Sequence, residues 1–212
     1  MNIDSNSDVQ TKERLVLGCG ALVYDLVRII DQNPELSKKV ELQCLPAIWH
    51  NKPQLIAPAV DKYLQEHANS YKEVYIAYAD CGTGGELDRV LTKYNAKRIG
   101  GSHCYEFFAG PKAFTELTNK ELGTFYLTDY LVKNFQRLII EGLGLDKHPE
   151  LFDAYFSNYK RLVYLAQTEN EQWKNDAAKY ADDFGFEYEY CFVGTGGLGS
   201  VFEDIELVTL KD

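Results

Sequence analysis

The sequence predicts an α/β protein with a mostly parallel open sheet, helices on both faces of the sheet and a helical insertion. Short apolar runs alternate along the chain with longer segments of helical spacing, and parallel strands need crossover helices of this kind. Hydrophobic residues make up 45% of the 212 residues, enough for the core of one domain. We therefore expect a single α/β domain over residues 14–212, preceded by a disordered polar arm at 1–13.

Six short runs predict the strands. The first, RLVLGC, is apolar and ends in Gly-Cys-Gly, and the second, VELQCLPAIW, alternates before it fills with apolar residues. EVYIAYA, the short KRIGG, RLVYLAQ and FEYEYCFV follow in that order. Runs of this length and composition, bounded by glycine and polar residues, are typical of strands. The predicted strands are 14–19, 40–49, 73–79, 97–101, 161–167 and 186–193.

Segments of helical spacing lie between these strands. Apolar residues recur at the helix period from Leu22 to Ile30, and Pro53 opens the next helix. ELDRVLTKYN follows the third strand, and the amphipathic EQWKNDAAKYADDFG ends at Gly185. Over 111–159 the pattern is helical without a strong strand, and YLTDYLVKNFQRLIIEGLG is amphipathic. This region is predicted to be the helical insertion, packed on the sheet as a lid.

Charge and cysteine content exclude several classes of protein. The formal net charge is −10, and no run of Lys or Arg exceeds isolated pairs, so we expect no nucleic-acid partner. No apolar run approaches the roughly 20 residues that span a bilayer, so no membrane association is expected. The first residues lack the apolar core of a secretory signal. Five widely spaced cysteines are an odd count, which favours reduced thiols and a cytoplasmic location.

Three of the thiols lie where ligands bind in open α/β sheets, outside the carboxyl ends of the strands. Cys19 ends the first predicted strand, Cys81 follows the third and Cys104 follows the fourth. Each lies before or beside a helix N-terminus, which favours the thiolate. We expect these three sulfurs to converge, whereas Cys44 and Cys191 lie within strands and are assigned to the core.

Three thiolates suit zinc with an open fourth position, or an iron–sulfur cluster with one other ligand. His103 is the candidate for the additional ligand or for a hydrogen bond that orients the site. The open position of zinc could bind a substrate thiol and lower its pKa for alkyl transfer. Asp80 and Glu169 are the candidate proton acceptors. Sulfurs that share zinc should lie within about 4 Å of one another.

Glycine turns favour a second hypothesis. Gly-Thr-Gly-Gly occurs at 82–85 and again at 194–197. CGTGGE lacks the spacing of a dinucleotide or phosphate-binding fingerprint, whereas GTGGLG at 194–199 is more like a nucleotide-binding string, although a lone glycine pattern is a weak signal. A Ser-His-Asp type of nucleophile–base set is not recognisable. The alternative is a non-catalytic module that binds a corrinoid, a nucleotide or a partner protein, with structural cysteines. Its candidate cofactor-binding residues are Gly82, Gly84, Gly85, Gly194 and Gly196.

Five segments together resemble domain-of-unknown-function family 1638: LVLGCGALVYDLVRI, LPAIWHNKP, YADCGTGGELDRVL, GSHCYEFFAG and GTFYLTDYLVKNFQRL. In the family pattern, a cysteine that closes the first strand is followed by a histidine–asparagine–proline element, a Cys-Gly turn and a cysteine loop. Lys52 interrupts the second of these elements, and His103 stands in the loop where an aspartate is expected. Because relatives are associated with corrinoid-dependent methyltransferases, the resemblance implies one-carbon metabolism, a small-molecule substrate and a corrinoid protein as partner. The matching positions are Cys19, His50, Cys81 and Cys104.

Overall fold

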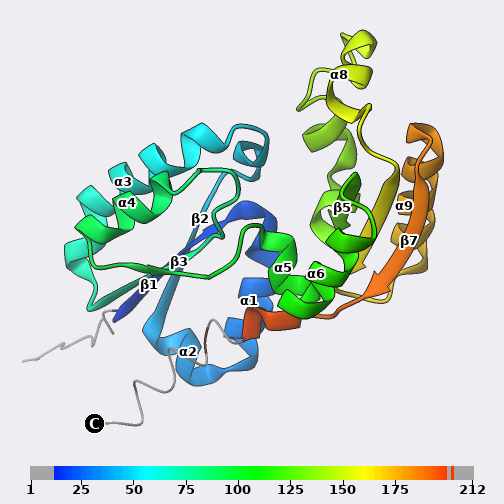
Figure 1. Cartoon of the computed structure of the whole chain (residues 1–212). Coiled ribbons are helices and arrows are strands. Elements are labelled where there is room, and N and C mark those ends of the chain that lie inside the picture. The colour runs from blue at the N-terminus through cyan, green and yellow to red at the C-terminus, as the bar shows by residue number, and fades with distance from the viewer. Residues whose placement is uncertain (1–11, 200–201, 203–212) are drawn as a thin grey trace, which may run out of the picture.

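The computed structural model describes residues 12–199 and residue 202, so most of the predicted arm at 1–13 lies outside the described residues. The described strands form two parallel sheets, one in the order β2-β1-β3-β4 and one in the order β5-β6-β7. Figure 1 shows the two sheets side by side, with α5 and α6 between them. The strands are β1 (Arg14–Cys19), β2 (Val40–Leu45), β3 (Glu73–Ala77), β4 (Lys97–Arg98), β5 (Thr124–Thr128), β6 (Arg161–Ala166) and β7 (Glu187–Phe192).

Helices cover both faces of the first sheet. In Figure 1, α3 and α4 lie on one face, and α1 and α2 lie on the other. Short 3₁₀ turns precede or follow several helices: η1 (Gly20–Leu22), η2 (Ala47–Asn51), η3 (Pro53–Leu55), η4 (Ala68–Ser70), η6 (Pro149–Leu151) and η7 (Gly196–Gly199), with a π-turn at η5 (Gln136–Ile140). The α-helices are α1 (Val23–Gln32), α2 (Pro34–Lys39), α3 (Ile56–His67), α4 (Glu86–Lys93), α5 (Cys104–Ala109), α6 (Pro111–Lys120), α7 (Asp129–Lys133), α8 (Phe152–Phe156) and α9 (Glu171–Phe184).

The central strand of the first sheet is β1, and all six of its residues are buried. It pairs in parallel with β2 on one side and with β3 on the other. The register sets Cys19 opposite Leu45 and Gly18 opposite Ala77. The chain segments that leave β1, β2 and β3 therefore start from the same edge of the sheet.

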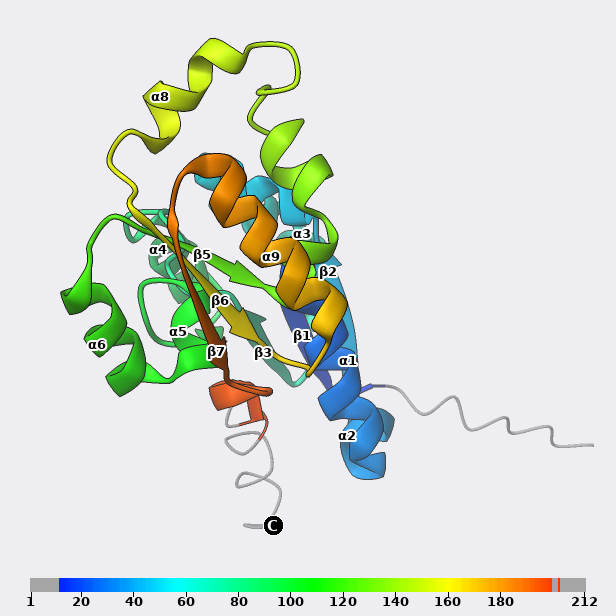
Figure 2. The ribbon, with the colours of Figure 1, turned by 90° about the vertical axis from the view of Figure 1, so that its right-hand side faces the viewer.

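Side chains of the second sheet pack in two different hydrophobic clusters, one on each face of the sheet. Successive residues of a strand point to opposite faces, so alternate residues belong to different clusters. Along β6, Leu162 and Tyr164 belong to a cluster with Ala177 and Ala181 of α9. Val163 and its neighbour two residues on, Leu165, pack instead with side chains of α6. Figure 2 shows α9 crossing the sheet and α6 beyond its other face.

The α/β class and the parallel strand direction are confirmed, but the strands are divided between two sheets where the sequence suggests one. The region 111–159 contains the expected helices and also β5, which hydrogen-bonds to β6. β2 stops at Leu45, because the chain turns into η2 after Pro46. β4 is reduced to two residues.

Candidate functional site

A small cavity of about 20 Å³ lies at the carboxyl ends of β1 and β3. That volume accommodates one water-sized occupant. Its lining side chains come from the half of the molecule built on the first sheet and from the half built on the second sheet. Thr128, which ends β5, and Leu131 of α7 belong to the second half. The lining residues are Cys19, Ala21, Leu22, His50, Ile56, Tyr78, Cys81, Cys104, Tyr105, Phe108, Thr128 and Leu131.

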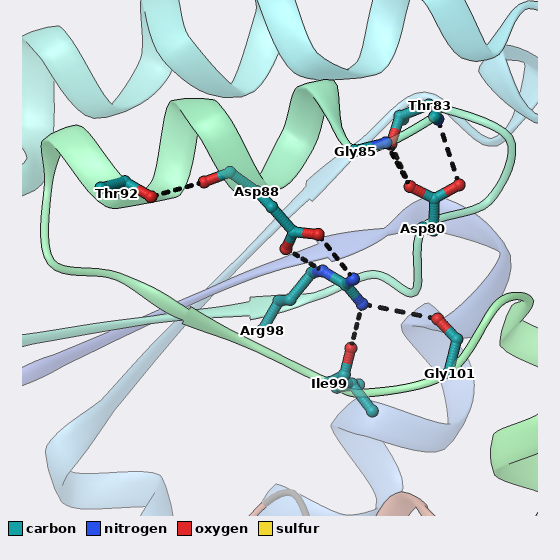
Figure 3. Close-up of polar contacts among 9 residues, drawn as sticks. Asp80, Thr83, Gly85, Asp88, Thr92, Arg98, Ile99 and Gly101 are labelled. Atoms are coloured by element: carbon teal, nitrogen blue, oxygen red, sulfur yellow. Dashed lines mark hydrogen bonds and ion pairs between the residues drawn. The ribbon is translucent and has the colours of Figure 1, made fainter.

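Cys81 begins a tight turn that its neighbour Asp80 holds together (Figure 3). The Asp80 carboxylate accepts hydrogen bonds from Thr83 Oγ1 at 2.9 Å and from the backbone N–H groups of Gly84 at 3.2 Å and Gly85 at 2.9 Å. These bonds, led by the one from Gly85, lower the pKa of Asp80. Cys81 has a φ of +47°, an uncommon backbone conformation for a residue other than glycine. Such conformations cluster at functional sites.

Cys81 and Cys104 are in direct contact, with their Sγ atoms 3.0 Å apart. The hydrogen bond from Cys104 lowers the pKa of Cys81. The same contact, reinforced by burial, raises the pKa of Cys104 well above its usual range. The two thiols therefore titrate as one interacting pair, in which the pKa of Cys81 is lowered and that of Cys104 is raised.

Cys19 ends β1 and lines the same cavity from a more buried position. It is 5% exposed, and its Sγ accepts a hydrogen bond from Ala21 N at 3.4 Å. Burial raises the pKa of Cys19 to about 12, and the nearby Cys81 adds to the shift. Beside Cys19 lies Tyr78, which is 2% exposed. The buried hydroxyl of Tyr78 and the thiol of Cys19 interact, since each shifts the pKa of the other.

His50 and Tyr105 also line the cavity. His50 Nε2 lies 3.1 Å from Tyr105 Oη, and the two rings meet edge to face. His50 is an exposed residue, but loss of water around its ring lowers its pKa, and neighbouring His103 lowers it further. Tyr105 also stacks on Tyr126 of β5, with ring centroids 5.4 Å apart, so α5 connects the cavity to the second sheet.

The other predicted site residues lie elsewhere. His103 is exposed as the residue before α5 and does not line the cavity. The Asp80 carboxylate is committed to its own turn. Glu169 is exposed in the turn between β6 and α9. Neither carboxylate lines the cavity. Cys44 and Cys191 are also outside its lining.

The candidate glycines serve the backbone of two turns. Gly82, Gly84 and Gly85 all have positive φ, at 82°, 62° and 82°. In the second turn, Gly194 and Gly196 have φ of 59° and 53°. A Cβ on Gly196 would lie 2.2 Å from Phe108 O, so this glycine permits close packing on α5.

Metal binding would require a small rearrangement of the sulfurs. Two thiolates on tetrahedral zinc lie roughly 3.8 Å apart, given bonds of about 2.3 Å. The Cys81–Cys104 separation is shorter, at 3.0 Å. Within residues 12–199 and 202, no three His, Cys, Asp or Glu side chains are already arranged as a metal site. The three thiols around the cavity are nevertheless the donor type that zinc and iron–sulfur clusters take.

Several residues of the site were not identified from the sequence. Tyr78 lies within an apolar run, and nothing in that pattern shows that its hydroxyl meets the cavity. Thr128 and Leu131 come from a half of the molecule that was predicted only as a helical cover. His50 could have been identified from the sequence, because it lies in the histidine–asparagine–proline element of the family pattern. The adjacent Asn51 donates to Leu138 O at 2.7 Å, which ties η2 to the second half.

The fold and the cavity define an α/β protein with a thiol-lined cavity between two parallel sheets. The chain belongs to the family described as protein of unknown function (DUF1638), whose model matches residues 44–201. The match includes His50, Cys81 and Cys104 and begins after Cys19. No curated protein and no solved structure matches the chain. A search of the described helices finds none with the length and apolar character needed to cross a membrane.

Proposed function

We propose that Cys19, Cys81 and Cys104 hold a soft metal ion, zinc in preference to an iron–sulfur cluster, in a cytoplasmic protein of methyl-group metabolism. The observation that carries the proposal is the meeting of three thiols from separate segments around one cavity of about 20 Å³. A cavity of that size suits a single ion. A corrinoid or a nucleotide is far larger.

The protonation of the thiols supports a cation at this place. Burial raises the pKa of Cys19, and the contact with Cys81 followed by burial raises that of Cys104, so without a cation these two sulfurs keep their protons. A bound divalent cation reverses this preference, because a coordinating thiol is deprotonated. Tyr78 adds a buried hydroxyl that interacts with the Cys19 thiol.

The proposed reaction is the activation of a substrate thiol for alkyl transfer. Zinc with three protein ligands supplies an open position that lowers the pKa of a bound thiol. The chain contributes an apolar wall that excludes water, including Ile56, Phe108 and Leu131. In this proposal His50, whose Nε2 lies 3.1 Å from Tyr105 Oη, takes up the proton. A corrinoid partner protein, if it supplies the alkyl group, would remain outside the cavity.

Charge and cysteine state support the proposed location and the expected absence of a nucleic-acid partner. All five cysteines are free thiols, which supports a reducing compartment such as the cytoplasm. The net charge of −10 disfavours nucleic acid as a partner.

Elemental analysis of anaerobically purified protein tests the proposal. We expect about one zinc per chain in the wild type and a large loss of metal in Cys19→Ser, Cys81→Ser and Cys104→Ser. Cys44→Ser and Cys191→Ser are the matched controls, because neither thiol lines the cavity, and both should keep the metal. Metal far below one equivalent in the wild type, or unchanged metal in the triple variant, would contradict the proposal.

A second candidate function is ligand binding by a groove of about 630 Å³ between α5, α6 and β7. Its volume is in the range of small-molecule sites, and Gly196 and Gly197 of the second turn line it. Lys120 and Glu189 are charged residues that line the groove, and Lys120 Nζ donates a hydrogen bond to Glu189 at 2.8 Å. A thermal-shift screen with corrinoids and nucleotides tests this candidate. A midpoint that none of them raises at high concentration would count against it.

A further inference from the structure

Two of the five thiols are positioned by the backbone to react with each other. Hydrogen bonds from Asp80 N to Gly101 O, at 3.2 Å, and from Cys81 N to Ser102 O, at 2.9 Å, tie the turn after β3 to the segment before α5. Cys81 and Cys104 lie on these two joined segments, with their sulfurs 3.0 Å apart. The contact is therefore built by the chain itself and requires no third group.

We propose that Cys81 and Cys104 form a redox-active dithiol that exchanges with low-molecular-weight disulfides such as oxidised glutathione. A disulfide bond is about 2.05 Å long, so the two sulfurs must approach by about 1 Å. Both residues are half-buried, whereas Cys19 is 5% exposed. A small disulfide in solution can therefore reach the pair more readily than it reaches Cys19.

The reaction proceeds in two exchange steps. One protein thiolate attacks a sulfur of the small disulfide, which forms a mixed disulfide and releases one small thiolate. The neighbouring protein thiol then loses its proton to solvent, and its sulfur attacks the mixed disulfide and releases the second small thiolate. In sum the protein dithiol gives up two electrons and two protons, and the small disulfide is reduced to two thiols.

The remaining cysteines lack this arrangement. Cys191 Sγ lies 3.9 Å from a carboxylate oxygen of Glu189. Cys44 lies within β2, opposite Gly18 of β1. The proposed dithiol chemistry is independent of the proposed metal centre, since it requires neither a metal nor Cys19. The two also exclude each other, because a Cys81–Cys104 disulfide would remove two of the three proposed ligands.

Thiol counting and peptide mapping on the metal-free full chain test the dithiol. Protein stripped with a chelator under anaerobic conditions is incubated with oxidised glutathione, and its free thiols are then counted. We expect the count to fall from five to three, with one peptide pair linked through Cys81 and Cys104. Dithiothreitol should restore all five thiols.

Two variants sharpen the result. In Cys104→Ser, exchange should stop at the mixed disulfide, so glutathione remains attached to Cys81. In Cys191→Ser, the Cys81–Cys104 link should form as in the wild type. A wild type that keeps five thiols, that accumulates mixed disulfides, or that links Cys19 instead would overturn the dithiol. Because the protein is metal-free throughout, the outcome does not depend on whether the metal proposal holds.

Discussion

The two Gly-Thr-Gly-Gly turns contain the same four residues in different surroundings. In the turn at 82–85, a Cβ added to Gly84 or Gly85 would meet nothing within 4 Å, and hydrogen bonds to Asp80 define the turn (Figure 3). In the turn at 194–197, a Cβ on Gly196 would lie 2.2 Å from Phe108 O and 2.5 Å from Phe107 O. The first turn is set by its own bonds, and the second by packing against α5.

Both turns nevertheless affect the same pair of thiols. The first begins directly after Cys81. The second packs on the carboxyl end of α5, whose first residue is Cys104. An identical local sequence therefore does not establish an identical role, because the surroundings decide which glycine is indispensable. Substitutions in the two turns should separate these roles.

The largest effect is expected from Gly196→Ala. The new Cβ would clash with backbone oxygens of α5, which cannot shift without moving the helix. Overpacking together with a positive φ predicts a loss of about 2–4 kcal/mol in the free energy of unfolding. Urea denaturation measures this loss, and a variant as stable as the wild type would show that the close approach to α5 is not required.

Asp80→Ala should have an intermediate effect. The substitution removes the carboxylate that accepts three hydrogen bonds. The expected loss in the free energy of unfolding is about 1–2 kcal/mol. Because the pKa of Asp80 is lowered in the folded protein, its contribution is present above the unfolded value of about 3.9 and lost as pH falls through the lower folded value. The difference between variant and wild type should therefore shrink in acid. A difference that is constant down to the lowest accessible pH would contradict this origin.

Gly84→Ala should have the smallest effect. Its φ is +62°, but a Cβ would meet no neighbour, so only the left-handed backbone conformation is penalised. The expected loss is about 1 kcal/mol. If Gly84→Ala destabilised the chain as much as Gly196→Ala, the contrast between the two turns would be wrong. The same urea titration compares both variants.

The sequence predicted the strands with the strongest patterns. β1 and β6 are apolar runs buried along their whole length, and a buried parallel strand requires such a run. β5 was missed because Thr128 ends the strand and its side chain caps α7 at the next residue, so the helical pattern that follows dominates the window. The division into two sheets depends on strand pairing, which no local pattern contains.

The candidate site was predictable to a similar extent. Cys19, Cys81 and Cys104 could be expected to lie near one another because the ends of parallel strands meet at one edge, and all three line the cavity. His103 is exposed before α5 and is not among the residues that line the cavity, so its role as a ligand stays a prediction. The roles of Tyr78, His50 and Tyr105 depend on contacts between distant segments.

X-ray absorption at the zinc edge of anaerobically purified protein tests the central claim most directly, because it counts the sulfur atoms bound to the metal. A centre held by Cys19, Cys81 and Cys104 predicts three sulfur neighbours at about 2.3 Å and one lighter atom. Cys19→Ser should reduce the sulfur count to two, while Cys44→Ser leaves it at three. A wild-type spectrum with only nitrogen and oxygen neighbours, or with no bound zinc to measure, would contradict the claim.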